Sequence, residues 1–73
     1  MGKSLYSKEY EFVLEQLKAA RIEAGFTQKD VADKLGKPQS YISKCESGER
    51  RVDIVEMNKL AKLYKKPLSF FTK

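Results

Sequence analysis

Apolar residues recur along the chain at the three- and four-residue spacing of helices, and no segment alternates as a strand does. The first such segment covers about residues 8–24 and ends at Gly25, which can take the left-handed backbone that closes a helix. Its expected inward face consists of Tyr10, Val13, Leu14, Leu17, Arg21 and Ala24. The chain is therefore expected to be all-α from its first ordered element onward.

Two further helices are marked by capping signals. Thr27, with Asp30 three residues later, predicts a second helix that runs to Leu35 and stops at Gly36. Asp53, with Glu56 three residues later, predicts a fourth helix that runs to about Tyr64. The expected inward face of the fourth helix consists of Ile54, Met57, Leu60, Ala61 and Tyr64. A last short helix is expected to begin at Pro67, which gives five helices in all.

A third helix, over about residues 39–47, is expected between Pro38 and Gly48. It offers a core only three apolar side chains, those of Tyr41, Ile42 and Cys45. Its opposite face carries Ser40, Ser43, Lys44 and Ser47 at i, i+3, i+4 and i+7. A helix with so little to bury is expected to present its polar face to a partner outside the domain, while Cys45 is expected to be a small buried residue with an unreactive thiol.

The connection between the second and third helices is the short segment "LGKP". It is too short for the two helices to lie antiparallel, so they are expected to cross steeply around Gly36, with the small Ala32 at the crossing. This geometry predicts a helix-turn-helix over about residues 28–47. We expect an N-terminal arm at residues 1–7 and a single domain at residues 8–73.

Composition removes several classes of function. The chain has 73 residues, one cysteine and no histidine, so an internal disulfide is impossible and a structural zinc site is not expected. No side chain suits a general base of the histidine type and no glycine-rich phosphate loop is present, so neither enzyme activity nor a cofactor nor a small-molecule ligand is expected. No apolar run is long enough to cross a membrane, which favours a cytoplasmic, nucleoid-associated protein. Because a core of this size is marginal, we expect a homodimer.

The charge of +5 is unevenly placed. Residues 1–36 carry six basic and six acidic side chains, whereas residues 37–73 carry nine basic and four acidic ones. The whole positive excess therefore begins at the polar third helix. A polyanion is the natural partner for such a half, and on charge alone a lysine-rich surface that only aids solubility is an equal alternative.

The segment "LKAARIEAGFTQKDVADKLGKPQSYISKCESGER" resembles the Xre, Cro and lambda-repressor-like helix-turn-helix proteins of bacteria and phages, and the resemblance covers about residues 14–71. The matching positions are Arg21, Gly25, Thr27, Gln28, Ala32, Leu35, Gly36, Ile42, Glu46 and Gly48. The resemblance implies a compact five-helix DNA-binding domain, usually dimeric, whose third helix enters the major groove. Two positions depart from the family pattern: Pro38 replaces the common serine or threonine N-cap, and Lys65 stands where glycine is frequent.

Carried over by position, the resemblance implies roles for individual side chains. The residues that would read bases are Gln39, Ser40 and Lys44. Bases or the DNA backbone would be contacted by Tyr41 and Ser43. Phosphates would be held by Thr27, Gln28, Ser47, Arg50 and Arg51. Arg21 and Glu46 would form a structural ion pair between the first and third helices. For Tyr41, a packing role beside the core is an equal alternative.

The expected function is therefore sequence-specific binding of double-stranded DNA by a transcriptional regulator, acting as a homodimer on a short palindromic operator. The expected dimer interface is formed by Leu68, Phe70 and Phe71, with one of the two phenylalanines internal and the other shared across the two-fold axis. The alternative is a protein-binding module, such as the antitoxin or anti-repressor subunit of a complex, that uses the same three apolar residues for docking. RNA binding has less support, because no exposed aromatic platform is evident.

Overall fold

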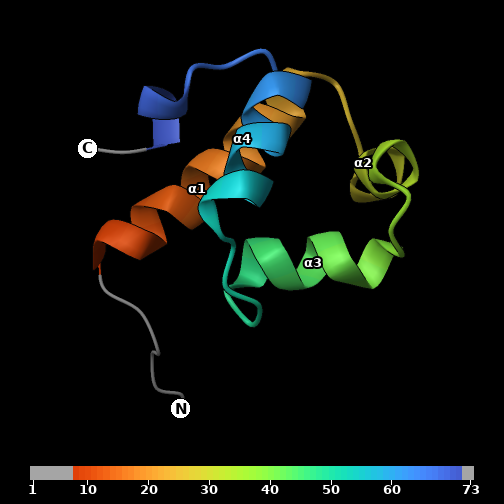
Figure 1. Cartoon of the computed structure of the whole chain (residues 1–73), viewed down its shortest axis with the longest axis horizontal. Coiled ribbons are helices and arrows are strands. Elements are labelled where there is room, and N and C mark those ends of the chain that lie inside the picture. Colours follow the sequence, from red (N-terminus) through yellow and green to blue (C-terminus); the bar gives the residue numbers. More distant parts are fainter. Residues whose placement is uncertain (1–7, 72–73) are drawn as a thin grey trace.

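The computed structural model describes residues 8–71 and is all-helical over that range (Figure 1). Its elements are α1 (Lys8–Glu23), α2 (Gln28–Leu35), α3 (Gln39–Ser47), α4 (Ile54–Leu63) and the 3-10 turn η1 (Leu68–Phe71). The expected all-α class is confirmed. The N-terminal arm expected at residues 1–7 lies outside the described residues.

The expected count of five helices is not confirmed, because the last short helix, expected from Pro67, is a 3-10 turn of only four residues, η1. The amide of Phe70 donates to the carbonyl of Pro67 at 2.9 Å, which is the i to i+3 bond of a 3-10 helix. So short a segment cannot build the repeated i to i+4 bonds of an α-helix. Within residues 8–71 the domain thus consists of four α-helices and one 3-10 turn.

Both predicted capping boxes are confirmed. The Thr27 hydroxyl accepts from the Asp30 amide at 3.0 Å, and the Asp30 carboxylate accepts from the Thr27 amide at 2.9 Å. Asp53 and Glu56 exchange the same two bonds at 2.8 and 3.1 Å. Each box satisfies two amides that a helix start leaves without partners, which fixes where α2 and α4 begin.

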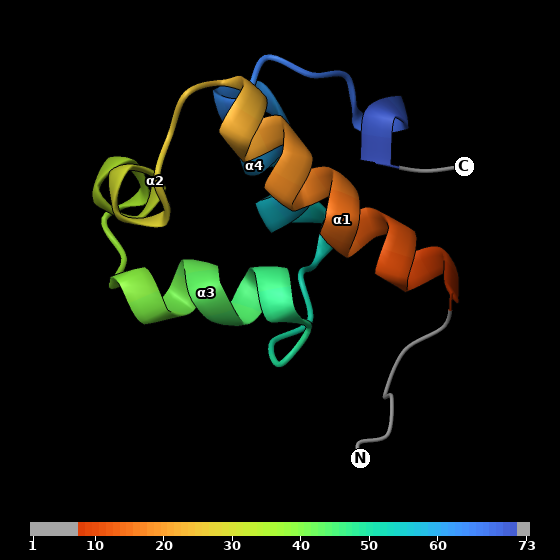
Figure 2. The same ribbon diagram turned by 180° about the vertical axis from the view of Figure 1, so that it is seen from behind.

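The four helices pack around one small core. In Figures 1 and 2, which view the ribbon from opposite sides, α1 and α4 cross at the centre, α2 is seen nearly end-on, and α3 runs along one edge. The turn η1 lies beside α1. The core consists of Leu17, Ala20, Val31, Ala32, Ile42, Cys45, Val52, Met57, Leu60, Ala61, Tyr64 and Phe71. Ala32 is 1% exposed, as expected of a small residue where α2 and α3 come close.

Ile54 differs from its expected inward position, since it is 68% exposed. It keeps helical spacing with Met57 and Ala61, which are buried, but it occupies the first position of α4. Periodicity alone does not say which positions of the stripe the neighbouring elements cover, and at the start of α4 they cover Val52 but leave Ile54 exposed. The next residue, Val55, is also exposed at 60%.

Phe71 is fully buried inside the domain, so it is the internal one of the two phenylalanines and is not available to the dimer interface to which it was also assigned. Its ring packs edge-on against that of Phe70, with 5.2 Å between centroids. Phe70 and Leu68 are half-buried and lie at the edge of the core. The side-chain amide of Gln16 on α1 donates to the carbonyl of Phe70 at 3.0 Å, which fixes η1 against α1.

The end of α4 turns through a left-handed residue. Lys65 has φ 59°, the conformation that favours glycine and that the family resemblance implies at this position. The next residue, Lys66, pairs with Glu23 at the end of α1 and lies 4.7 Å from the centroid of the Phe70 ring. These contacts hold the chain on the path that leads to η1.

Candidate nucleic-acid interface

Helix α3 has a buried face and an exposed face with different chemistry. Ile42 and Cys45 are 2% and 1% exposed and belong to the core. The outward side chains are Gln39, Ser40, Ser43, Lys44 and Ser47, all of them exposed. The helix begins after Pro38, whose side chain makes no capping hydrogen bond. The outward face is thus polar, free of acid and available to a partner.

An open depression of about 830 Å³ lies beside this face. Its lining consists of Lys37, Pro38, Ser40, Tyr41, Lys44, Glu49, Arg50 and Arg51, and we call it the basic depression. Four of these side chains are cationic and one is anionic. A surface of this charge and openness suits an extended polyanion better than a small enclosed ligand.

Tyr41 lines the basic depression and is half-buried against the core. Its hydroxyl donates to Glu56 Oε2 at 2.6 Å. The cations of Lys37 and Arg50 lie 5.3 and 4.8 Å from the centroid of its ring. These contacts give Tyr41 the packing role that was one of its two expected alternatives, and the ring and hydroxyl are already engaged within the domain.

Arg50 is bound by the same carboxylate. Its Nη2 donates to Glu56 Oε2 at 2.5 Å, while Glu56 Oε1 caps α4. The hydroxyl of Tyr41 and then the guanidinium of Arg50 lower the pKa of Glu56 from 4.5 to about 2. Burial, followed by the bond to Glu56, raises the pKa of Tyr41 to about 12. Tyr41, Arg50 and Glu56 therefore form one charged cluster, in which Glu56 was expected only as a helix cap.

This cluster predicts a specific pH dependence for the variant Glu56→Gln. Because the folded pKa of Glu56 lies below its ordinary value of 4.5, its stabilising contribution is complete above pH 4.5 and is lost as the pH falls toward 2. At pH 7 the variant should lose about 1.5 kcal/mol of unfolding free energy. This value is the lower end for hydrogen bonds to a charged group, and we choose it because 20% of the Glu56 side chain is exposed to solvent, which weakens the interaction. Urea melts at pH 7 and near pH 2 check this, and a difference that persists unchanged at the lower pH would contradict it.

The basic loop, residues 48–53 between α3 and α4, is also fixed on α1. The guanidinium of Arg51 lies 5.0 Å from the centroid of the Tyr10 ring, and the Tyr10 hydroxyl accepts from the amide of Val52 at 3.0 Å. Arg51 itself is exposed. The loop between α3 and α4 thus holds both arginines at the end of the polar helix, as the expected phosphate contacts require.

The other residues expected at phosphates already have partners within the domain. Gln28 donates through Nε2 to Glu46 Oε1 at 3.1 Å, and the hydroxyl of Thr27 caps α2. The hydroxyl of Ser47 donates to the carbonyl of Lys44 at 3.2 Å. Gln28 retains a second amide hydrogen, and Ser47 is exposed. Their contacts with phosphate stay predictions.

Arg21 and Glu46 form the ion pair that the resemblance implies. Arg21 Nε donates to Glu46 Oε2 at 2.7 Å, and Arg21 Nη1 donates to the carbonyl of Phe26 at 2.8 Å. The two side chains are only 10% and 7% exposed. The pair joins α1 to the C-terminal end of α3, and the contact from Gln28 extends it to α2.

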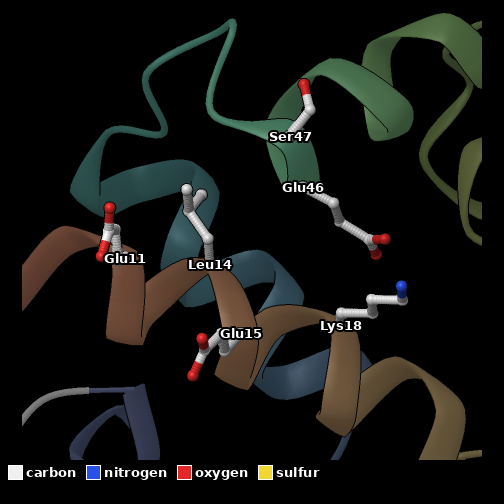
Figure 3. Close-up of a pocket in the computed structure, with 6 residues that line it drawn as sticks. All are labelled: Glu11, Leu14, Glu15, Lys18, Glu46 and Ser47. Carbon is white, nitrogen blue, oxygen red and sulfur yellow. The ribbon is translucent and has the colours of Figure 1, made fainter. Parts of the chain in front are cut away.

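A shallow pocket of about 290 Å³ separates α1 from the end of α3 (Figure 3). Its lining consists of Glu11, Leu14, Glu15, Lys18, Glu46 and Ser47. Three of these six residues are acidic, and their charge is partly offset by Lys18 in the same lining and by Arg21, which pairs with Glu46. This side of α3 therefore favours a polyanion less than the basic depression does.

Among residues 8–71, no group of three or more His, Cys, Asp or Glu side chains could hold a metal ion. Cys45 is buried, and burial raises the pKa of its thiol. None of the helices in the same range is long and apolar enough to cross a bilayer.

Helices α2 and α3 cross steeply, α3 exposes a polar face, and the basic loop follows α3 in the chain. These features define a helix-turn-helix domain. The family model described as Helix-turn-helix matches residues 17–71, well over half of the chain. The chain belongs to this family, the Xre, Cro and lambda-repressor-like helix-turn-helix proteins, and is a DNA-binding regulator of the kind that typically has no enzymatic activity. No curated protein and no solved structure gave a significant match.

Proposed function

We propose that the protein is a transcriptional regulator that places α3 in the major groove of a short palindromic operator and acts as a homodimer. The observation that carries this proposal is the exposed, acid-free face of α3 beside a depression lined by four cations. Cationic side chains supply the sequence-independent affinity for the DNA backbone. Polar side chains on a helix of this exposure supply the contacts that distinguish bases.

Within this surface we assign two kinds of contact. Gln39 has the bidentate amide suited to adenine N6 and N7, Lys44 can donate to guanine O6 or N7, and Ser40 can adapt to either neighbour. Ser43 lies on the same exposed face and reaches a base or the backbone. Residues assigned to phosphates are Thr27, Gln28, Ser47, Arg50 and Arg51, which position the helix without reading sequence.

The variant Gln39→Ala tests the base-reading role. On an operator selected from random duplexes, it should lose roughly 1–3 kcal/mol of binding free energy and relax the preference at one base pair per half-site. The salt dependence of binding should stay nearly unchanged, because Gln39 is assigned to a base and neutralises no phosphate. A Gln39→Ala protein that keeps the full sequence preference would refute this assignment.

The variant Arg50→Ala is the matched test of a phosphate contact and should behave in the opposite way. It should weaken binding to operator and scrambled duplexes about equally and reduce the salt slope by about one for each phosphate that Arg50 neutralises. Titrations with both duplexes at several salt concentrations measure this. Equal affinity of the unaltered protein for operator and scrambled DNA would show that α3 does not read bases.

We infer homodimer formation through the half-buried residues Leu68 and Phe70 of η1. In such a dimer the two copies of α3 would meet half-sites about one helical turn apart, ~34 Å. Replacing Phe70 by lysine should shift the protein from dimer to monomer in sedimentation experiments, because a charge would be buried at the two-fold axis. A variant that stays as associated as the unaltered protein would place the interface elsewhere.

The alternative of a protein-docking module relied on an apolar surface formed by Leu68, Phe70 and Phe71. Because Phe71 is internal, that surface is reduced to two half-buried side chains, which weakens the docking alternative and the dimer contact alike. The DNA-binding proposal is favoured instead by the cations that line the basic depression. Salt separates the two functions. Affinity for DNA should fall steeply between low and moderate salt, whereas an apolar protein contact should hardly change.

A further inference from the structure

Arg50 is unusually well fixed for a residue in an exposed loop. Its guanidinium lies 4.8 Å from the centroid of the Tyr41 ring and is bonded through Nη2 to Glu56. Glu56 is fixed in turn, because its Oε2 accepts from the Tyr41 hydroxyl and its Oε1 accepts from the amide of Asp53. The arginine is therefore held by two anchored groups that belong to different helices, α3 and α4.

This arrangement leaves part of the Arg50 guanidinium accessible to a phosphate. The Arg50 side chain is 45% exposed and lines the basic depression. A guanidinium carries N–H donors on three nitrogens, and the bond to Glu56 is made by Nη2. The remaining donors can meet a phosphate while the salt bridge to Glu56 is kept.

Two opposing effects of Glu56 on a bound phosphate can be distinguished. Its negative charge repels the phosphate, an effect that solvent and salt weaken at this surface. Its hold on Arg50 removes rotamer freedom that the arginine would otherwise lose on binding. We expect the second effect to dominate, because solvent and salt screen the charge of Glu56 at this surface, whereas the rotamer freedom of Arg50 is removed before the phosphate binds and the guanidinium stays 45% exposed.

We propose that Glu56 and Tyr41 are positioning residues that hold Arg50 as a preformed phosphate-binding group beside α3. The inference rests on the proposed function in one respect, since the phosphate is taken to be that of double-stranded DNA. It assigns Glu56, which is acidic, a supporting role in binding a polyanion. Simple charge counting predicts the opposite.

The decisive variant is Glu56→Gln, which removes the charge and keeps an oxygen that can cap α4. Its affinity for the selected operator and for scrambled DNA should fall about threefold to tenfold. The matched control is Glu49→Gln, because Glu49 lines the same depression and lies outside the cluster. That control should bind as tightly as the unaltered protein or more tightly, since it only removes negative charge.

The contribution of Arg50 is isolated by repeating Glu56→Gln in an Arg50→Ala background, where it should no longer weaken binding. Circular dichroism at the binding temperature ensures that only folded variants are compared. Tyr41→Phe, which keeps the ring and removes the hydroxyl bond, should weaken binding by a smaller factor of about two. The proposal is overturned if Glu56→Gln binds as tightly as the unaltered protein, or if it weakens binding equally with and without Arg50.

A measurement on the free protein separates this inference from the proposed function. In NMR relaxation experiments, the Arg50 Nε–H group should be rigid in the unaltered protein and mobile in Glu56→Gln. Equal mobility in both would overturn the inference whatever the protein binds. If the unaltered protein does not prefer operator over scrambled DNA, the proposed function is overturned. The NMR comparison then decides by itself whether Glu56 holds Arg50 in place.

Discussion

Replacing Glu46 by alanine should lower the free energy of unfolding by about 3–5 kcal/mol, the cost of leaving one partner of a buried ion pair without the other. Arg21 would keep its bond to the carbonyl of Phe26, but its charge would remain in a site where its side chain is 10% exposed. Gln28 would also lose the acceptor for its side-chain amide. Three helices would be loosened at once, because these contacts join α1, α2 and α3.

Urea melts measure this loss, and the chain offers a matched control. Lys29 and Asp33 form an ion pair on the surface of α2 with side chains 70% and 66% exposed, so Asp33→Ala should cost less than about 0.5 kcal/mol. The double variant Arg21→Met, Glu46→Leu should be less destabilised than Glu46→Ala, since no unpaired charge remains. A loss for Glu46→Ala no larger than that for Asp33→Ala would refute a structural role for the buried pair.

Replacing Phe71 by alanine should destabilise the domain by about 3–5 kcal/mol, the usual cost of removing a large buried aromatic side chain. Phe71 has no exposed surface and is the largest fully buried side chain of the described core. The turn η1 is too short to be stable alone, so its attachment to α1 and α4 depends on this ring. The free energy of unfolding of a domain of this size is small, so a loss of this magnitude should be a large fraction of it.

Thermal unfolding followed by circular dichroism checks this expectation, with Phe70→Ala as the neighbouring control. Phe70 is half-buried, so its removal should cost clearly less than that of Phe71. If Phe71→Ala melts with the unaltered protein, then η1 is not part of the cooperative unit. Sedimentation of the same variants shows whether the loss arises within one chain or between two.

Local signals were enough to predict most of the fold. The starts of α2 and α4 depend on side chains three residues apart, Thr27 with Asp30 and Asp53 with Glu56, so their caps could be found without knowledge of the tertiary structure. The division of α3 into a buried and an exposed face likewise follows from helical spacing alone. The role of Arg21 came instead from the family resemblance.

What the sequence did not predict depends on how the elements meet. Ile54 fits the inward spacing of α4, yet no spacing rule tells where the core ends. Tyr41 and Glu56 are 15 residues apart, so their bond depends on the path of the loop between α3 and α4. Phe70 and Phe71 are adjacent and equally apolar, and only the packing of η1 on α1 decides that Phe71 is the internal one.

The separation of the two faces of α3 has a consequence for how the protein could evolve. Ile42 and Cys45 belong to the core and hold the helix in place, while Gln39, Ser40, Ser43 and Lys44 are exposed. Substitutions at these four exposed positions should change stability by no more than about 0.5 kcal/mol each. Under the proposed function, mutation can therefore change the DNA sequence that is preferred without first unfolding the scaffold, so that duplicated copies of such a gene could acquire distinct targets through a few substitutions that leave stability nearly unchanged.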